Sequence, residues 1–253
     1  MSSSLNVVSW NLNGLDAHEL DRRMEAAALG LLMRQPQPEV LLFQEVTDRG
    51  LNAHLRRHLC AVGYAMALQP QTGSYYVAAF VRPPAVLTAA TFHPLGGQLG
   101  RGMLLLELTF QGESWQLGTA HLESGPPAGP TRIEQTERLL DVLDAHPGPA
   151  VFAGDTNLRD RELQDRIEQR GWADAWQATG RAPDEEATWS PPHGAAPMRL
   201  FRFDRAWVNA QVQVNDFCTV TNGITGDGQV VAVSDHKGMC FGLSHTVGTD
   251  QGV

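Results

Sequence analysis

Short apolar segments that begin or end in polar or charged residues recur along the chain, and this pattern constrains the fold most strongly. The clearest case lies within Val151–Glu162, where the apolar run 151–153 is followed by a glycine and then by Asp155, Thr156 and Asn157. The glycine lets the backbone turn sharply where a strand ends. Asp and Asn also cap turns routinely, so this stretch alone is equally consistent with an ordinary loop.

The recurrence favours an active site over a set of unrelated turns. Charged side chains at the ends of buried strands are costly unless they are paired or bind a metal. Several such residues in one chain are therefore a stronger signal than any single member. The polar residues placed at strand ends are Asn11, Glu45, His121, Asp155, Asn157, Asp204, Asp235 and His236.

Hydrophobic periodicity predicts the elements that carry these residues. Apolar residues at helical spacing predict helices over 18–34 and 51–59, and Thr131 with Glu134 has the spacing of a capping box at the start of another. A further helix is expected from near Asp160 to Gly171. Predicted strands cover 5–11, 40–43, 75–81, 103–110, 115–121, 151–153, 203–208 and 239–243. Since only some strands are separated by helices, we predict an α+β fold with two packed, mainly antiparallel sheets and outer helices.

The 253 residues can form one large domain, and no linker interrupts them. The Pro/Gly-rich pieces at Gly125–Pro130 and Pro191–Pro197 are short and are expected to be loops within that domain. We therefore predict that residues 1–253 form a single catalytic domain.

The formal net charge of -9 argues against a broad basic face that coats nucleic acid. A local basic groove remains compatible with this charge. Of the 19 basic residues only Lys237 is lysine, so phosphate contacts would be of the planar, bidentate arginine type. The arginine bias is explained equally well by genome composition.

The cysteines and the chain start bear on location. Cys60, Cys218 and Cys240 lack the spacing of metal ligands and are expected to be small buried side chains in a reduced compartment. The N-terminal residues do not resemble a signal peptide, and no run of about 18 apolar residues occurs. We expect a cytoplasmic protein without a membrane partner.

The candidate metal ligands are oxygen donors. Hard divalent cations prefer carboxylate and amide oxygens, which Glu45, Asn11 and Asp235 can supply. Such a cation offsets charge on an attacked phosphate and on the leaving oxygen. The alternative for Glu45 is a simple cap of the following helix.

The remaining residues suit hydrolysis of a phosphodiester. Asp155 could orient or deprotonate a water, and Asn157 could donate to a phosphoryl oxygen. His236, oriented by Asp204, could act as a charged donor or acid. A surface ion pair with the neighbouring arginines is the alternative for Asp204. His121 could instead be a core histidine whose ring bonds to backbone.

These motifs in this order resemble the endonuclease/exonuclease/phosphatase family, and the resemblance spans nearly the whole chain. Membership implies a four-layer α/β/β/α sandwich and magnesium-dependent cleavage of phosphoester bonds, with manganese as a substitute. The motifs are Trp10-Asn11, Gln44-Glu45, His121, Gly154-Asp155-x-Asn157 and Ser234-Asp235-His236.

Longer matches at 119–124, 154–160 and 200–205 resemble the tyrosyl-DNA phosphodiesterase 2 branch of that family. This branch cleaves the bond between a protein tyrosine and the 5′ phosphate of DNA, which repairs protein–DNA adducts. The resemblance implies metal binding by Glu45 and Asp235, supported by Asn11. It also places His121 and Ser124 in the same pocket.

Three further residues are candidates for binding a DNA 5′ end that is single-stranded or linked to a protein. We expect the enzyme to be a monomer. Arg159 and Arg101 offer charge, and Trp189 offers a stacking surface. A core tryptophan is the alternative for Trp189. A solvated arginine in a loop is the alternative for Arg101.

Two departures leave the substrate open. Asn13 stands where the branch often has Asp, and the segment from Trp10 to Leu15 is equally similar to the exonuclease III type. Lys237 stands where the animal enzymes have an aromatic residue. The alternative function is therefore an apurinic endonuclease, an exonuclease III-like nuclease or another phosphoesterase of the family. A catalytically dead binding module is the alternative from a different class, although every catalytic position carries a competent residue type.

Overall fold

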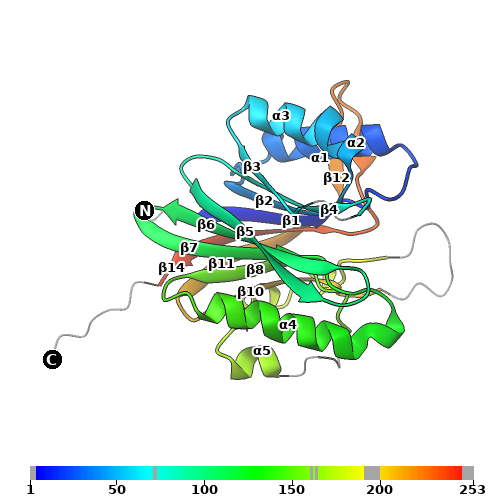
Figure 1. The fold of residues 1–253 in the computed structure, drawn as a ribbon. Coiled ribbons are helices and arrows are strands. Elements are labelled where there is room, and N and C mark those ends of the chain that lie inside the picture. Colours follow the sequence, from blue (N-terminus) through cyan, green and yellow to red (C-terminus); the bar gives the residue numbers. More distant parts are fainter. Residues whose placement is uncertain (1–3, 71–72, 160–161, 163–164, 191–199, 247–253) are drawn as a thin grey trace.

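The computed structural model describes residues 4–70, 73–159, 162, 165–190 and 200–246. Two six-stranded sheets pack face to face, and helices lie on both outer faces (Figure 1). The predicted α+β sandwich is confirmed. The predicted loop at Pro191–Pro197 and the predicted helix start at Asp160 lie outside the described residues.

The first sheet has the strand order β11-β14-β1-β2-β4-β3. Its strands are β1 (Leu5–Asn11), β2 (Val40–Val46), β3 (Ala65–Leu68), β4 (Tyr76–Val81), β11 (Val212–Val220) and β14 (Gly238–His245). Strands β1 and β2 run parallel, and the other neighbours are antiparallel. Its outer face carries α1 (Leu20–Met33), α2 (Asp48–Gly50), the π-helix η1 (Leu51–Leu55), α3 (Arg56–Ala61) and the hairpin of β12 (Asn222–Ile224) with β13 (Val230–Ala232).

The second sheet has the order β5-β6-β7-β8-β10-β9. Its strands are β5 (Val86–Gly96), β6 (Arg101–Phe110), β7 (Glu113–Ala120), β8 (Ala150–Asp155), β9 (Ala173–Asp174) and β10 (Asp204–Val208). The remaining helices are η2 (Pro126–Ala128), α4 (Gly129–Asp144), α5 (Arg166–Gln169), α6 (Ala175–Ala178) and η3 (Pro183–Glu185). Helix α4 begins at Gly129 without a side-chain cap, so the predicted capping box at Thr131 is wrong. The predicted loop at Gly125–Pro130 is also wrong in part, because this segment contains η2 and the first residues of α4.

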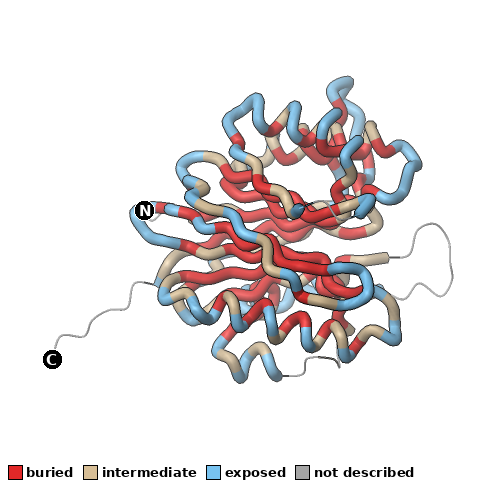
Figure 2. The backbone as a smooth tube through the Cα atoms, viewed as in Figure 1, coloured by how far each residue is buried: buried red, intermediate tan, exposed pale blue. Residues whose placement is uncertain are grey.

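The apolar side chains of the core form three clusters. Figure 2 shows buried residues running along the strands of both sheets and on the helices that cover them. Strand β1 lies inside its sheet, between β14 and β2, and is buried on both faces. Leu5 and Val7 point into the layer between the sheets, while Val8 and Trp10 point into the layer under α1. Burial on both faces explains why the apolar run of β1 shows no clear alternation in sequence.

The parallel strand pairs decide where the polar strand ends meet. Asn11, the last residue of β1, pairs with Gln44 near the end of β2, and His121, just after β7, forms a parallel bridge with Asp155, the last residue of β8. Asp204 lies opposite Asp155 at the start of the antiparallel strand β10. Because parallel strands end at the same edge, polar residues from both sheets gather at one edge of the sandwich.

The expectation of buried cysteines holds for Cys240 only. Cys60 is exposed on α3 and Cys218 is half-buried on β11. The prediction was wrong for these two because α3 turns Cys60 to solvent and β11 lies at the edge of its sheet. Among the described residues, no helix has both the length and the apolar character needed to cross a membrane.

Candidate active site

The carboxylate of Asp155 lies at the centre of the polar edge and is 1% exposed. Its Oδ1 accepts a hydrogen bond from the backbone N–H of Asn157 at 2.9 Å. Its Oδ2 accepts one from Asn11 Nδ2 at 2.8 Å and lies 3.4 Å from His121 Nε2. The turn interpretation is therefore confirmed for Oδ1. Oδ2 lies among Asn11, His121 and His236, and a catalytic role for it stays a prediction.

His236 forms a buried ion pair behind this carboxylate. Its Nδ1 lies 2.8 Å from Asp204 Oδ2, and its Nε2 lies 3.8 Å from Asp155 Oδ2. Burial lowers the pKa of His236, but the charges of Asp204 and Asp155 outweigh it and raise the pKa to about 10. Asp204 is 1% exposed, so its predicted alternative as a surface ion pair is wrong.

One atom of each of Asp155, Asp204 and His236 lies within 4.8 Å of the others, close enough to hold a metal ion. A protonated imidazole has no lone pair for a metal. The hydrogen bond to Asp204 and the raised pKa of His236 therefore favour a charged His236–Asp204 ion pair over a metal site at this position.

Glu45 supplies a second carboxylate from the end of β2. Its backbone is left-handed, with φ of 53°, and its Oε1 lies 3.3 Å from Asn11 Nδ2. Burial raises the pKa of Glu45, and the charges of Asp155 and Asp235 raise it further despite the hydrogen bond from Asn11. Helix α2 is capped by Thr47 instead, so the cap alternative for Glu45 is wrong. Crowded carboxylate oxygens of this kind fit a hard divalent cation, which would offset their repulsion.

Trp189 fixes the third carboxylate. Its Nε1 donates to Asp235 Oδ2 at 2.9 Å, and its ring packs against Phe201 and Phe203. Ser234 lies 3.4 Å from the other oxygen of Asp235. Trp189 is half-buried and borders a cavity that also touches Asp155 and His236. It is therefore not the fully buried core tryptophan of the alternative.

His121 is 6% exposed, and its Nδ1 has no hydrogen-bond partner. Burial lowers its pKa to about 3, and the charges of Arg101 and His236 add to this effect against the pull of Asp155. The ring is therefore neutral at physiological pH. Because Nδ1 lies 3.9 Å from Glu45 Oε1 and bonds no backbone group, the alternative of a satisfied core histidine is wrong.

Arg101 is the first residue of β6 and is 6% exposed, so the alternative of a solvated loop arginine is wrong. Its guanidinium carbon lies 5.3 Å from the ring centroid of Tyr75. The two residues line a cavity of about 160 Å³ that also touches Glu45 and His121. Tyr75 was not among the predicted site residues, although the adjacent aromatic pair at 75–76 was an available signal.

The central cavity of about 280 Å³ is lined by Glu45, Arg101, His121, Ser124, Asp155, Asn157, Trp189, Asp235 and His236, together with Asn13, Leu15, Tyr75 and Phe203. Asn11 and Asp204 lie behind it, bonded to residues that line it. Arg159 does not line it: its guanidinium lies 5.9 Å from the Phe203 ring centroid and 3.5 Å from the Gly125 carbonyl oxygen.

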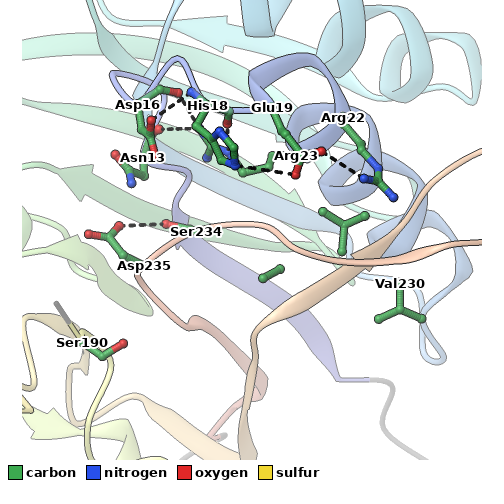
Figure 3. A pocket seen from close by; sticks show the side chains of 12 residues that line it. Asn13, Asp16, His18, Glu19, Arg22, Arg23, Ser190, Val230, Ser234 and Asp235 are labelled. Atoms are coloured by element: carbon green, nitrogen blue, oxygen red, sulfur yellow. Dashed lines mark hydrogen bonds and ion pairs between the residues drawn. The ribbon is translucent and has the colours of Figure 1, made fainter. Parts of the chain in front are cut away.

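A larger cavity of about 470 Å³ adjoins the centre on the side of Asp235. Figure 3 shows Asn13 and Asp235 at its inner end and Arg22 and Val230 at its far end. Arg23 in its wall donates to backbone carbonyl oxygens, including those of residues 12 and 233, and fixes the shape of this region.

Comparison with known proteins agrees with this geometry. A 5′-tyrosyl-DNA phosphodiesterase of Caenorhabditis elegans is 30% identical over 217 residues, covering 80% of this chain and 57% of that protein. Human tyrosyl-DNA phosphodiesterase 2 is 27% identical over 225 residues, covering 83% of this chain and 59% of that protein. The chain thus spans somewhat more than half the length of these curated relatives.

Solved structures of tyrosyl-DNA phosphodiesterase 2 are also similar to this chain. A humanized Danio rerio tyrosyl-DNA phosphodiesterase 2 superposes with a TM-score of 0.84 at 26% identity, covering 96% of this chain and all of that one. The Danio rerio enzyme in complex with a single-strand DNA product gives 0.83 at 25% identity, with the same coverage. The family model of the Endonuclease/Exonuclease/phosphatase family matches residues 8–236. This chain belongs to the endonuclease/exonuclease/phosphatase family.

Proposed function

We propose that this chain hydrolyses the phosphodiester bond between a protein tyrosine and a DNA 5′ phosphate, in a magnesium-dependent reaction that repairs protein–DNA adducts. The observation that carries the proposal is the cavity lined by Arg101 and Tyr75, which opens beside the carboxylate and histidine centre. An aromatic ring flanked by a guanidinium and a second ring gains cation–π and stacking stabilisation. The names of the relatives point to the same substrate.

Asp155 is the residue proposed to orient and deprotonate the attacking water. Asn11 fixes its Oδ2 at 2.8 Å, and the turn hydrogen bond from Asn157 fixes its Oδ1. A carboxylate held at both oxygens loses little freedom when the water binds, which is the requirement for effective positioning.

The phosphate is proposed to bind between three side-chain donors. His236 carries a positive charge because it is paired with Asp204, and its Nε2 faces the cavity side of Asp155. Neutral His121 offers a ring N–H. Asn157 offers its side-chain amide, whose Nδ2 makes a long hydrogen bond of 3.3 Å to the Leu122 carbonyl oxygen. Donors held in place before the reaction stabilise charge that develops on the phosphoryl oxygens.

Glu45, Asp235 and Asn11 are proposed to hold magnesium, for which manganese would substitute. The bound ion would supply Lewis-acid stabilisation of the phosphate and of the leaving oxygen. The fit of this donor set rests on its oxygen chemistry and on the mutual repulsion of Glu45, Asp155 and Asp235.

The DNA strand is proposed to leave the centre along Trp189 and Ser124, with Arg159 adding positive charge from behind Phe203. The aromatic wall suits unstacked bases of a single-stranded or protein-linked 5′ end. We further propose that residues 1–253 act as a single catalytic domain, as a monomer, in the cytoplasm.

The test is cleavage of an oligonucleotide carrying a 5′-phosphotyrosine, with magnesium and then with excess chelator. Wild type with magnesium should release a 5′-phosphate end, and Asp155→Asn should bind the oligonucleotide but turn it over at least about 100-fold more slowly. Asp165→Asn is the matched control, since Asp165 is exposed and lies outside the site. Absence of cleavage, together with activity on an abasic duplex, would instead assign the apurinic endonuclease function.

A further inference from the structure

Cys218 and Cys240 form a pair of thiols away from the polar edge. The strands β11 and β14 are antiparallel, and the two cysteines occupy directly opposite positions in their register. Both side chains lie on the face covered by α1, where Cys240 is part of the apolar layer and Cys218 packs against it. Their thiols are therefore neighbours on that face.

This placement is compatible with a covalent bond between the two sulfurs. Opposite residues of an antiparallel pair have Cα atoms about 4.5 to 5.5 Å apart, and disulfides span Cα separations of about 4.4 to 6.8 Å. The strands therefore need no large movement to allow the bond. A disulfide directly across two paired strands is geometrically constrained, and constrained disulfides are the more easily reduced ones.

Arg34 distinguishes the two sulfurs. It follows the last turn of α1, and its Nη2 donates a hydrogen bond to Cys218 Sγ at 2.8 Å. The neighbouring Cys240 thiol and the charge of Arg34 outweigh burial and lower the pKa of Cys218 to about 6, while the proximity of Cys218 and burial raise the pKa of Cys240. The other charged groups that act on this pair are Asp216, which faces Arg34, and Glu185 of η3.

Cys218 is the member of the pair that a small reagent can approach. It is half-buried on β11, which lies at the edge of its sheet, whereas Cys240 is buried. Cys60 is more exposed, but its thiol has a raised pKa because partial burial of the side chain outweighs the charge of the nearby Arg56. Reactivity of thiols follows thiolate character and access, so Cys218 is expected to react before Cys60.

We propose that Cys218 and Cys240 are a peroxide-sensitive modification site that closes reversibly into a disulfide. The Cys218 thiolate attacks one oxygen of a hydroperoxide, breaking the O–O bond and giving a sulfenic acid; the other oxygen leaves with a proton. The Cys240 sulfur then attacks the Cys218 sulfur, the S–O bond breaks, and the hydroxyl leaves as water with the Cys240 proton. The two sulfurs together lose two electrons, and the hydroperoxide gains them.

The test treats the intact, folded chain with hydrogen peroxide and follows mass, free thiols and peptide maps. Wild type and Cys60→Ser should each lose two hydrogens per chain, give a 218–240 linked peptide, and return to the starting mass with dithiothreitol. Loss of two hydrogens without that linked peptide would overturn the proposal. So would oxidation that adds only oxygen, at any of the three cysteines.

Three variants separate the roles of the residues. Cys240→Ser should trap a sulfenic acid at Cys218, detectable with dimedone, and Cys218→Ser should leave Cys240 unreacted over the same time. Arg34→Gln should slow disulfide formation at neutral pH by at least about fivefold, because it removes the cation beside the reacting sulfur. An unchanged rate in Arg34→Gln, or dimedone labelling at Cys60 in place of Cys218, would contradict the proposal. The measurement on wild type stands even if a variant fails to fold.

Discussion

The guanidinium of Arg132 makes two hydrogen bonds to the carboxylate of Glu162, at 2.9 and 2.6 Å, although Arg132 is fully buried. Its remaining nitrogen donates to the carbonyl oxygens of Glu123 and Gly125. Glu162 in turn accepts from the backbone N–H of Arg159 at 3.2 Å. One side chain on α4 thus ties together the segment after β7 and the segment after β8, both of which border the candidate active site.

Replacing Arg132 should therefore be costly. We expect Arg132→Leu to lower the free energy of unfolding by about 3 kcal/mol, because it leaves the largely buried Glu162 carboxylate and two carbonyl groups without their donor. Urea denaturation would measure this. Arg166→Leu is the control: Arg166 is exposed and pairs with Glu137, so its loss should cost less than about 1 kcal/mol. Equal effects of the two changes would contradict the assigned role.

The same pair predicts how stability depends on pH. Burial raises the pKa of Glu162, but the hydrogen bonds from Arg132 and from the Arg159 N–H outweigh it and hold the pKa below the ordinary value of 4.5. A carboxyl with a depressed folded-state pKa stabilises the fold above its unfolded pKa, and this contribution is lost as pH falls through the folded value. We expect the stability of wild type to fall below pH 4.5 more steeply than that of Glu162→Gln. Parallel curves in urea melts between pH 7 and the acid limit of the fold would refute this.

Arg101 should distinguish aryl from alkyl leaving groups. We expect Arg101→Gln to reduce kcat/KM about tenfold on a 5′-phosphotyrosyl oligonucleotide, because a partly desolvated cation–π contact contributes about 1 to 2 kcal/mol. On a 5′ end esterified to an aliphatic alcohol the change should be small. Arg138→Gln, outside the central cavity, is the control. A similar loss on both substrates would mean that Arg101 acts on the phosphate and not on the ring.

Glu45 should control the metal. We expect Glu45→Gln to raise the magnesium concentration needed for half-maximal activity at least about tenfold, since it removes one charged ligand from the proposed set. Titration calorimetry with magnesium alone gives a readout that does not depend on turnover. Glu39→Gln provides a control carboxylate just before β2, at the opposite end of that strand, where Glu39 accepts hydrogen bonds from Asn6. Unchanged magnesium affinity in Glu45→Gln would exclude Glu45 as a ligand.

The central strands were predictable from sequence because each is an apolar run that ends in a polar residue. The edge strands were not. Strand β5 alternates between exposed and half-buried residues and contains Pro94, and β11 mixes polar and apolar residues without a continuous apolar run. Their pairing depends on long-range partners, so neither carries a strong local signal.

The same distinction applies to the site. Asp155, Glu45 and His236 follow from their positions at strand ends. The burial of Arg101 does not, because it requires Tyr75, which immediately precedes β4, to approach it. Nor could the pairing of Cys218 with Cys240 be predicted, since it depends on the register that follows the bulge between Val214 and Asp216.

The two oxygens of Asp155 belong to one rigid planar group, so the turn that follows β8 and the direction of Oδ2 depend on the same side-chain torsions. We expect a shift of the backbone at Asn157 to rotate Oδ2, the oxygen proposed to hold the attacking water. Variation in this protein is therefore expected to be tolerated on the walls formed by Tyr75, Arg101 and Trp189, where a new side chain changes which molecule fits. Variation in the turn itself would change whether any molecule reacts.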